Sequence, residues 1–133
     1  MTTPATEMSV PCIHYLRRDI GEADEGLGAL TVGVLPARAI VVQAGVIVST
    51  AFNGTSPILQ IGTSGDADGF ATNLALGTIG NIVWDELATS NDLYSTSEVT
   101  VTCTATATGN DSTAGYGSVY VGFIPYNGVG RAS

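Results

Sequence analysis

Strict alternation of apolar and polar residues is clearest in the last third of the chain. From Val99 to Thr108 every second residue is a threonine, and the residues between the threonines are apolar. Successive side chains of a β-strand point to opposite faces, so this pattern predicts a strand with one hydroxyl-bearing face and one apolar face. A sheet with one wet face is typical of antiparallel β proteins.

Seven further segments have the residue pattern of strands. The longest covers residues 39–52, where Val42, Ala44, Val46 and every second residue after them are predicted to share one face. Gly45, in the middle of this segment, predicts a bulge or a bend at which the strand changes partner. Residues 70–76 fit either a short helix or a strand. The other candidates cover residues 12–20, 31–35, 58–61, 79–84 and 117–126.

Turn-forming residues separate these segments. Asn53-Gly54 is a strong turn signal, residues 62–69 are predicted to be a loop, and residues 109–112 form another turn. Strands that follow each other about a dozen residues apart, without helices between them, indicate a sandwich or a barrel. About eight strands favour a jelly roll. We therefore expect an all-β, antiparallel β-sandwich, jelly-roll-like, over residues 12–127.

The two ends of the chain lack this periodicity. Residues 1–11 are rich in threonine and proline and are expected to form an extended arm that lies along a partner. Residues 128–133 are expected to form a short polar tail. The predicted contact residues of the arm are Thr2, Thr3, Pro4, Thr6, Met8 and Val10.

Composition narrows the range of partners. Twelve acidic residues against four arginines, with no lysine, give a net charge of −8, so the surface repels phosphate and anionic lipid. We expect no nucleic-acid or membrane partner, no secretory signal and no membrane-spanning helix, since no apolar run approaches about 20 residues. Charged residues make up only 12% of the chain, and short side chains replace them. This composition suits a protein that works in an assembly, and equally a soluble monomer.

Residues that carry catalysis are sparse. His14 is the single histidine and lies in a predicted strand, which favours a structural role over that of a base in a Ser-His-Asp triad. The chain has no Gly-x-Ser-x-Gly elbow, no Cys-x-x-Cys and no phosphate-binding glycine loop, so we expect no enzyme and no cofactor. Cys12 and Cys103 occupy apolar positions and are expected to be buried thiols, although a disulfide is open if their strands are neighbours.

Carboxylates gather at two places. Asp66 and Asp68, in the sequence Asp-Ala-Asp-Gly, are the best candidates for a calcium site, because such a loop supplies two carboxylates and a tight turn. No glutamate closes this loop as in an EF-hand, and aspartate and glycine are ordinary turn residues, so a plain turn is favoured. The acidic loop with Glu22, Asp24 and Glu25 is likewise expected to be solvated rather than ligating.

Tyrosines are the remaining candidates for binding. Tyr94, Tyr116, Tyr120 and Tyr126 offer rings that stack on sugars or line a protein interface. Scattered surface and core positions are the more ordinary use of tyrosine and are favoured here.

Short motifs at the predicted turns and strand starts of residues 31–70 form a recognisable series. Residues 33–40 read Gly-Val-Leu-Pro-Ala-Arg-Ala-Ile and lead into the longest predicted strand, which ends in Ala-Phe-Asn-Gly at 51–54. Leu-Gln-Ile-Gly-Thr follows at 59–63, and Asp-Ala-Asp-Gly-Phe at 66–70. This order resembles small accessory virion proteins of tailed bacteriophages, the head decoration (cement) or head-fibre proteins. It covers residues 31–70 and is a pattern of turns rather than a catalytic signature.

The resemblance implies a β-sandwich that trimerises on a capsid. We accordingly expect a non-enzymatic virion structural protein, a capsid decoration protein that stabilises contacts between capsomers of the major capsid protein. Its expected partners are the major capsid protein and two further copies of itself, on the outer surface of a virion assembled in the bacterial cytoplasm. The alternative is a tail or head fibre adhesin that binds a host receptor or glycan. An enzymatic jelly roll, cupin-like or glycan-cleaving, is disfavoured by the single histidine and the missing metal cluster.

Overall fold

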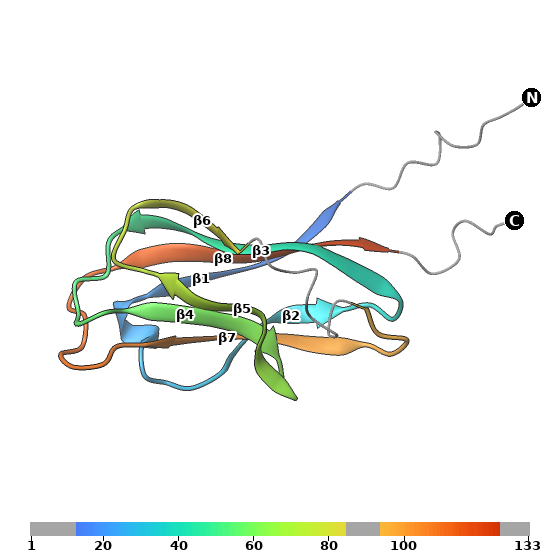
Figure 1. The fold of residues 1–133 in the computed structure, drawn as a ribbon, viewed down its shortest axis with the longest axis horizontal. Coiled ribbons are helices and arrows are strands. Elements are labelled where there is room, and N and C mark those ends of the chain that lie inside the picture. The colour runs from blue at the N-terminus through green and yellow to red at the C-terminus, as the bar shows by residue number, and fades with distance from the viewer. Residues whose placement is uncertain (1–12, 85–93, 126–133) are drawn as a thin grey trace, which may run out of the picture.

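Two four-stranded antiparallel sheets make up the computed structural model, which describes residues 13–84 and 94–125. Figure 1 shows the sheets as two layers. The upper layer has the order β1 (His14–Gly21), β8 (Tyr116–Pro125), β3 (Ala39–Thr50) and β6 (Gly80–Trp84). The lower layer has the order β2 (Leu30–Leu35), β7 (Val99–Thr106), β4 (Ile58–Thr63) and β5 (Asp66–Ala75), and a short 3-10 helix, η1 (Glu22–Asp24), follows β1. The predicted all-β, antiparallel sandwich is confirmed.

The strands pair in a nested order. β1 pairs with β8, β2 with β7, β3 with β6 and β4 with β5, every pair antiparallel. Further pairing of β3 with β8 and of β4 with β7 joins these pairs into the two sheets. Strands from the two ends of the described chain therefore lie side by side. Within the described residues, no helix is long and apolar enough to cross a membrane.

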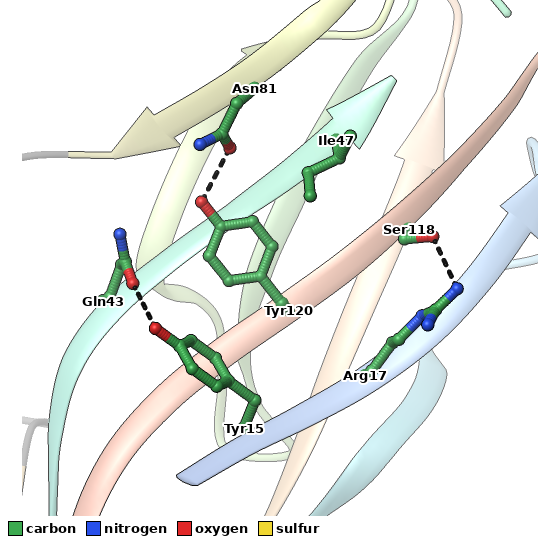
Figure 2. Close-up of a pocket in the computed structure, with 7 residues that line it drawn as sticks. All are labelled: Tyr15, Arg17, Gln43, Ile47, Asn81, Ser118 and Tyr120. Carbon is green, nitrogen blue, oxygen red and sulfur yellow. Dashed lines mark hydrogen bonds between the residues drawn. The ribbon is translucent and has the colours of Figure 1, made fainter. Parts of the chain in front are cut away.

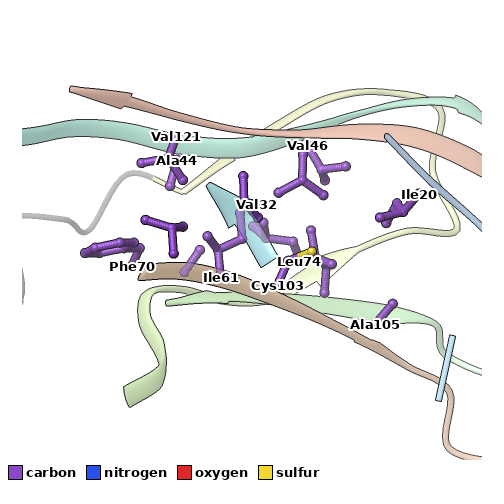
Figure 3. Close-up of a cluster of buried hydrophobic side chains, with 14 of the residues drawn as sticks. Ile20, Val32, Ala44, Val46, Ile61, Phe70, Leu74, Cys103, Ala105 and Val121 are labelled. Atoms are coloured by element: carbon purple, nitrogen blue, oxygen red, sulfur yellow. The ribbon is translucent and has the colours of Figure 1, made fainter. Parts of the chain in front are cut away.

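The core fills the space between the sheets (Figure 3). Val46 and Val121 of the upper sheet face Ile61 and Cys103 of the lower sheet, and all four side chains are fully buried. Strands whose alternate residues are apolar bury one face each, and this burial is the main favourable term in folding. The other face of each sheet is left at the surface of the sandwich.

The threonine-rich segment forms β7, as predicted. Val101, Cys103 and Ala105 are buried in the core, whereas the threonines point to the outer face of the lower sheet. That face is not solvent-exposed throughout, because Thr102 is only 6% exposed. The Thr102 hydroxyl has no hydrogen-bond partner among the described residues. Gly62 of β4 lies opposite Thr102, and a Cβ on Gly62 would collide with the backbone at the start of β5. The chain thus crosses closely over the sheet beside this threonine.

The bulge in the longest strand lies earlier than Gly45. The register of β3 against β8 shifts between Val41 and Gln43, whereas Gly45 is paired regularly with both neighbouring strands. As a result Val41 is buried and Val42 is exposed, so the prediction that Val42 shares a face with Ala44 and Val46 is wrong. The predicted face is correct for Ala44, Val46 and Val48, but a second register shift lies between Val48 and Thr50, and Thr50 is exposed.

The predicted loop at residues 62–69 is also wrong. β4 continues through Thr63, two residues make a turn, and β5 begins at Asp66. Residues 70–76 are predominantly strand rather than helix, since β5 runs to Ala75. Two register shifts between β4 and β5 disturb the alternation of β5.

Several predictions concern residues that are not described. They are the arm of residues 1–11 with its contact residues Thr2, Thr3, Pro4, Thr6, Met8 and Val10, the thiol of Cys12, the ring of Tyr126 and the tail of residues 128–133.

Candidate functional site

The outer surface of the upper sheet gathers aromatic, amide and paired charged side chains. They alternate along β1, β8, β3 and β6 with residues that point into the core. Four of the exposed large hydrophobic side chains of the described chain lie on this surface: Tyr15, Ile47, Val83 and Tyr116. We call the surface the tyrosine face, and define it by Tyr15, Arg17, Asp19, Gln43, Ile47, Asn81, Val83, Tyr116, Ser118 and Tyr120.

Tyr120 reaches across one strand of the sheet. Its ring extends from β8 over Gly45 of β3, and its hydroxyl donates a hydrogen bond of 2.8 Å to Oδ1 of Asn81 on β6 (Figure 2). A Cβ at Gly45 would lie 2.8 Å from the hydroxyl oxygen of Tyr120, so glycine makes room for the ring. Partial burial raises the pKa of Tyr120, and the hydrogen bond to Asn81 acts in the opposite direction with a smaller effect.

Tyr15 repeats this arrangement one strand away. Its ring extends from β1 over Gly122 of β8, and its hydroxyl donates a hydrogen bond of 3.1 Å to Oε1 of Gln43 on β3. A Cβ at Gly122 would lie 2.9 Å from Cε1 of Tyr15. The Tyr15 and Tyr120 rings meet nearly edge to face, with their centroids 6.0 Å apart, a favourable aromatic geometry.

A hollow of about 470 Å³ opens between these side chains. Figure 2 shows the residues that line it, with the amides of Gln43 and Asn81 bonded to the tyrosines and Arg17 bonded to Ser118. Its described lining contains no histidine, cysteine, aspartate or glutamate. The hollow can therefore stack and hydrogen-bond a ligand, but its lining has no ordinary general base.

The charged residues of the tyrosine face are bound to each other. Arg17 forms an ion pair with Asp19 at 2.9 Å, and the Ser118 hydroxyl donates to the same carboxylate oxygen at 2.7 Å. Hydrogen bonds from Ser118, Tyr116 and Arg17, in that order of effect, hold the pKa of Asp19 below its usual value. The bond to Asp19 in turn raises the pKa of Tyr116. The pair leaves this part of the surface without net charge, in a chain whose net charge is −8.

The structure brings two of the predicted tyrosines together. Tyr116 and Tyr120 project from the same face of β8, two rows apart along the strand. Tyr94 is elsewhere, at an isolated bridge with Ile40. Tyr15 was not among the predicted tyrosines, because the apolar and polar residues of its strand do not alternate cleanly. Gly122 leaves room for the Tyr15 ring, but the sequence does not show that the two residues lie opposite each other. Only the pairing of β1 with β8 shows this.

The carboxylate candidates do not form a cluster. Asp66 and Asp68 are exposed on β5 rather than held in a loop. Among the described residues, no group of three or more histidine, cysteine, aspartate or glutamate side chains is placed to hold a metal ion.

The acidic loop contains one residue that departs from the prediction. Glu22 is exposed, but Glu25 is only 9% exposed and accepts hydrogen bonds from the backbone N–H and hydroxyl of Ser112, at 2.7 and 2.9 Å. The expectation that Glu25 is solvated is therefore wrong. Its carboxylate is a structural acceptor between two loops that lie far apart in sequence.

The histidine and the described cysteine have structural surroundings. His14 is exposed at the start of β1, and its ring stacks on Phe123 with centroids 5.7 Å apart. The Cys103 thiol is free and buried in the core, and burial raises its pKa to about 11. The predicted buried thiol at Cys103 is confirmed.

Two solved phage structures share this fold. A chain of the cyanophage Pam1 capsid asymmetric unit matches with a TM-score of 0.64 and 16% identity, over 95% of this chain and 93% of that one. A chain of the acid-stable capsid of Helicobacter pylori bacteriophage KHP30 matches with a TM-score of 0.65 and 15% identity, over 86% of this chain and 90% of that one. No protein-family model and no curated protein matches the sequence. At these identities the likeness establishes the fold.

Proposed function

We propose that this chain is a non-enzymatic structural protein of a phage virion, and specifically a capsid decoration protein. The observation that carries the proposal is the likeness in fold to chains of two phage capsids, which extends over nearly the whole length of both partners in the Pam1 match. A likeness to one part of a larger chain would say less, because a shared domain serves many functions.

The strand order supports this assignment. In a jelly roll, an eight-stranded sandwich common in viral capsid proteins, the first strand pairs with the last, the second with the seventh, and so on inward. The nested pairing of β1 with β8 through β4 with β5 has this order. We therefore propose a jelly roll, in which residues 12–127 form the domain and residues 1–11 the arm.

The surface composition supports work in an assembly. The paired Arg17 and Asp19 leave the tyrosine face locally neutral, and Ile47 and Val83 are 49% and 41% exposed. A neutral surface with exposed apolar groups docks without bringing like charges together. Among the described strands, β1, β6, β2 and β5 are sheet edges whose outer backbone groups can pair with a neighbour, and the chain has no lysine to guard such edges.

In the proposed arrangement the domain sits on the outer surface of the capsid as a homotrimer. It contacts the major capsid protein across the joints between capsomers. Threonine and proline cannot supply a core to the arm, but an extended segment of this kind can lie along a neighbouring subunit. Assembly would take place in the cytoplasm of the bacterial host.

Deletion of the arm tests its role in attachment. Full-length chain and a variant lacking residues 1–11 are titrated onto capsids that lack the protein, and bound copies are counted after sedimentation. We expect the deletion to weaken binding at least tenfold, while thermal unfolding of the domain stays unchanged. A variant with residues 1–11 replaced by a glycine-serine segment of equal length controls for length. Unchanged affinity of the deleted chain would show that the arm has no such role.

The mass of the protein in solution tests the oligomer separately. We expect sedimentation equilibrium to give about three times the 13.5 kDa of one chain at the concentrations that saturate capsids. A monomer at those concentrations would contradict the homotrimer and leave the capsid assignment to the titration above.

A further inference from the structure

The hollow on the tyrosine face has the chemistry of a small-ligand site. Its volume of about 470 Å³ falls within the range of ligand pockets, which is about 300–1,000 Å³. Aromatic rings and convergent polar groups line it, as is usual for such pockets. We propose that it binds a neutral saccharide unit. This goes beyond the proposed function, because a capsid-binding protein does not itself require a sugar site.

The two tyrosines provide the apolar part of the site. Tyr15 is 55% exposed, so much of its side chain is available to a ligand, and its ring stands edge to face with that of Tyr120. The C–H face of a pyranose packs on such a ring, whose face is electron-rich. Gly122 and Gly45 lie beneath the two tyrosines and leave the room in which the rings are held.

The two carboxamides provide oriented donors. Because the oxygens of Gln43 and Asn81 accept the tyrosine hydroxyls, the orientation of each amide is fixed. Figure 2 shows both amide nitrogens on the side away from the bonded hydroxyl. Within the described part of the chain neither NH₂ group has a partner, and each offers two donors. The phenolic oxygens of the two tyrosines add hydrogen-bond acceptors. Together, the amide donors and phenolic acceptors match sugar hydroxyls, which both donate and accept hydrogen bonds.

Charge selects a neutral ligand over an acidic one. The guanidinium of Arg17 is engaged by Asp19 at 2.9 Å and by Ser118 at 3.3 Å. It is thus already neutralised, and the net charge of −8 repels anions at longer range. The carboxylate of an acidic sugar would find no unpaired cation in the hollow. A neutral sugar needs no cation, so the pairing of Arg17 with Asp19 does not weaken its binding.

A titration followed by NMR tests the site in the full-length chain. The probes are methyl β-glucopyranoside, methyl β-galactopyranoside and N-acetylglucosamine, with glucuronate as the charged comparison. We expect at least one neutral sugar to cause saturable shifts confined to residues around the hollow, with millimolar affinity and weaker binding of glucuronate. Tyr15→Ala, at an exposed position, should weaken binding about tenfold, and Tyr120→Phe should weaken it severalfold. Tyr94→Ala, outside the hollow, should leave binding unchanged.

Three results would overturn the sugar site. They are no saturable shifts with any of the three neutral sugars, stronger binding of glucuronate than of all of them, or unchanged affinity in Tyr15→Ala. The same variants are assayed for capsid attachment. Loss of attachment in Tyr15→Ala, without sugar binding by the parent chain, would make the hollow part of a protein interface instead.

Discussion

The buried carboxylate of Glu25 joins loops at one end of the sandwich. Ser112, in the loop between β7 and β8, donates its backbone N–H and its hydroxyl to this carboxylate. The Ser112 hydroxyl oxygen also accepts the backbone N–H of Gly54, from the loop between β3 and β4, at 2.8 Å. A buried charge is tolerated only when it is hydrogen-bonded. The loops after β1, β3 and β7 are thus fixed together by one short chain of bonds.

Replacing this serine tests the importance of the chain of bonds. Ser112→Ala removes the hydroxyl and leaves one Glu25 oxygen and the Gly54 N–H unpaired, so we expect the free energy of unfolding to fall by about 2 kcal/mol. The measurement is urea unfolding near neutral pH. Ser64→Ala, at an exposed turn position, is the control and should stay within about 0.5 kcal/mol. An equal, small effect of both substitutions would contradict the role given to Ser112.

The Cys103 thiol predicts a loss of stability in alkali. Burial raises the pKa of Cys103 to about 11 in the folded chain, against 9.0 for a solvated thiol. The stability tied to this thiol is complete below about pH 9, and it is lost as pH rises toward 11, because only the unfolded chain then ionises. We expect this to amount to about 2 kcal/mol, measured in a Cys12→Ser background. Cys103→Ala should remove that part of the pH dependence, and an unchanged slope would contradict the assignment.

At the scale of the strands, alternation predicted the elements well and failed at bulges. The β7 pattern is regular, and its inner and outer residues were assigned correctly. In β5, Phe70, Ala71 and Leu74 are all buried, a spacing that resembles a helix. The register shifts against β4 and the left-handed backbone of Asn73, with φ of 55°, produce that spacing. A bulge adds a residue to one strand, and the sequence of that strand alone does not locate it.

The candidate site could be predicted only in part from the sequence, because its residues come together through strand pairing. Tyr120 was a candidate because of its residue type and strand, but Tyr15 and the amides reach it from strands far away in the chain. Which glycine lies beneath which ring depends on register. The register of β1 on β8 places Gly122 opposite Tyr15, and the register of β3 on β8, which shifts between Val41 and Gln43, places Gly45 opposite Tyr120. The sheet pairing, rather than any local motif, creates the hollow.

Gly45 is therefore expected to be required for the close packing of Tyr120 and β6 against β3. Gly45→Ala places a Cβ 2.6 Å from the Ile82 carbonyl oxygen and 2.8 Å from the Tyr120 hydroxyl, so β6 and the ring must shift. We expect a loss of about 2 kcal/mol in unfolding free energy and a changed Tyr120 environment in the near-UV circular dichroism. Gly65→Ala is the matched control, since nothing lies within 4 Å of its added Cβ. Equal stability of the two variants would show that Gly45 is not required for close packing.

At the scale of the whole molecule, the described residues form a sandwich without a cluster of metal ligands and with a neutral outer face. Its fold likeness to phage capsid chains spans nearly the entire sequence in the Pam1 match. Among the described residues, the ion pair between Arg17 and Asp19 lies on the tyrosine face.

Cryo-electron microscopy of particles assembled with and without this chain tests the central proposal most directly. The proposal predicts density for the eight-stranded sandwich at regular positions on the outer surface, over joints between capsomers, and its absence from particles made without the chain. Particles that contain no such density, although the chain was present during assembly, would contradict it.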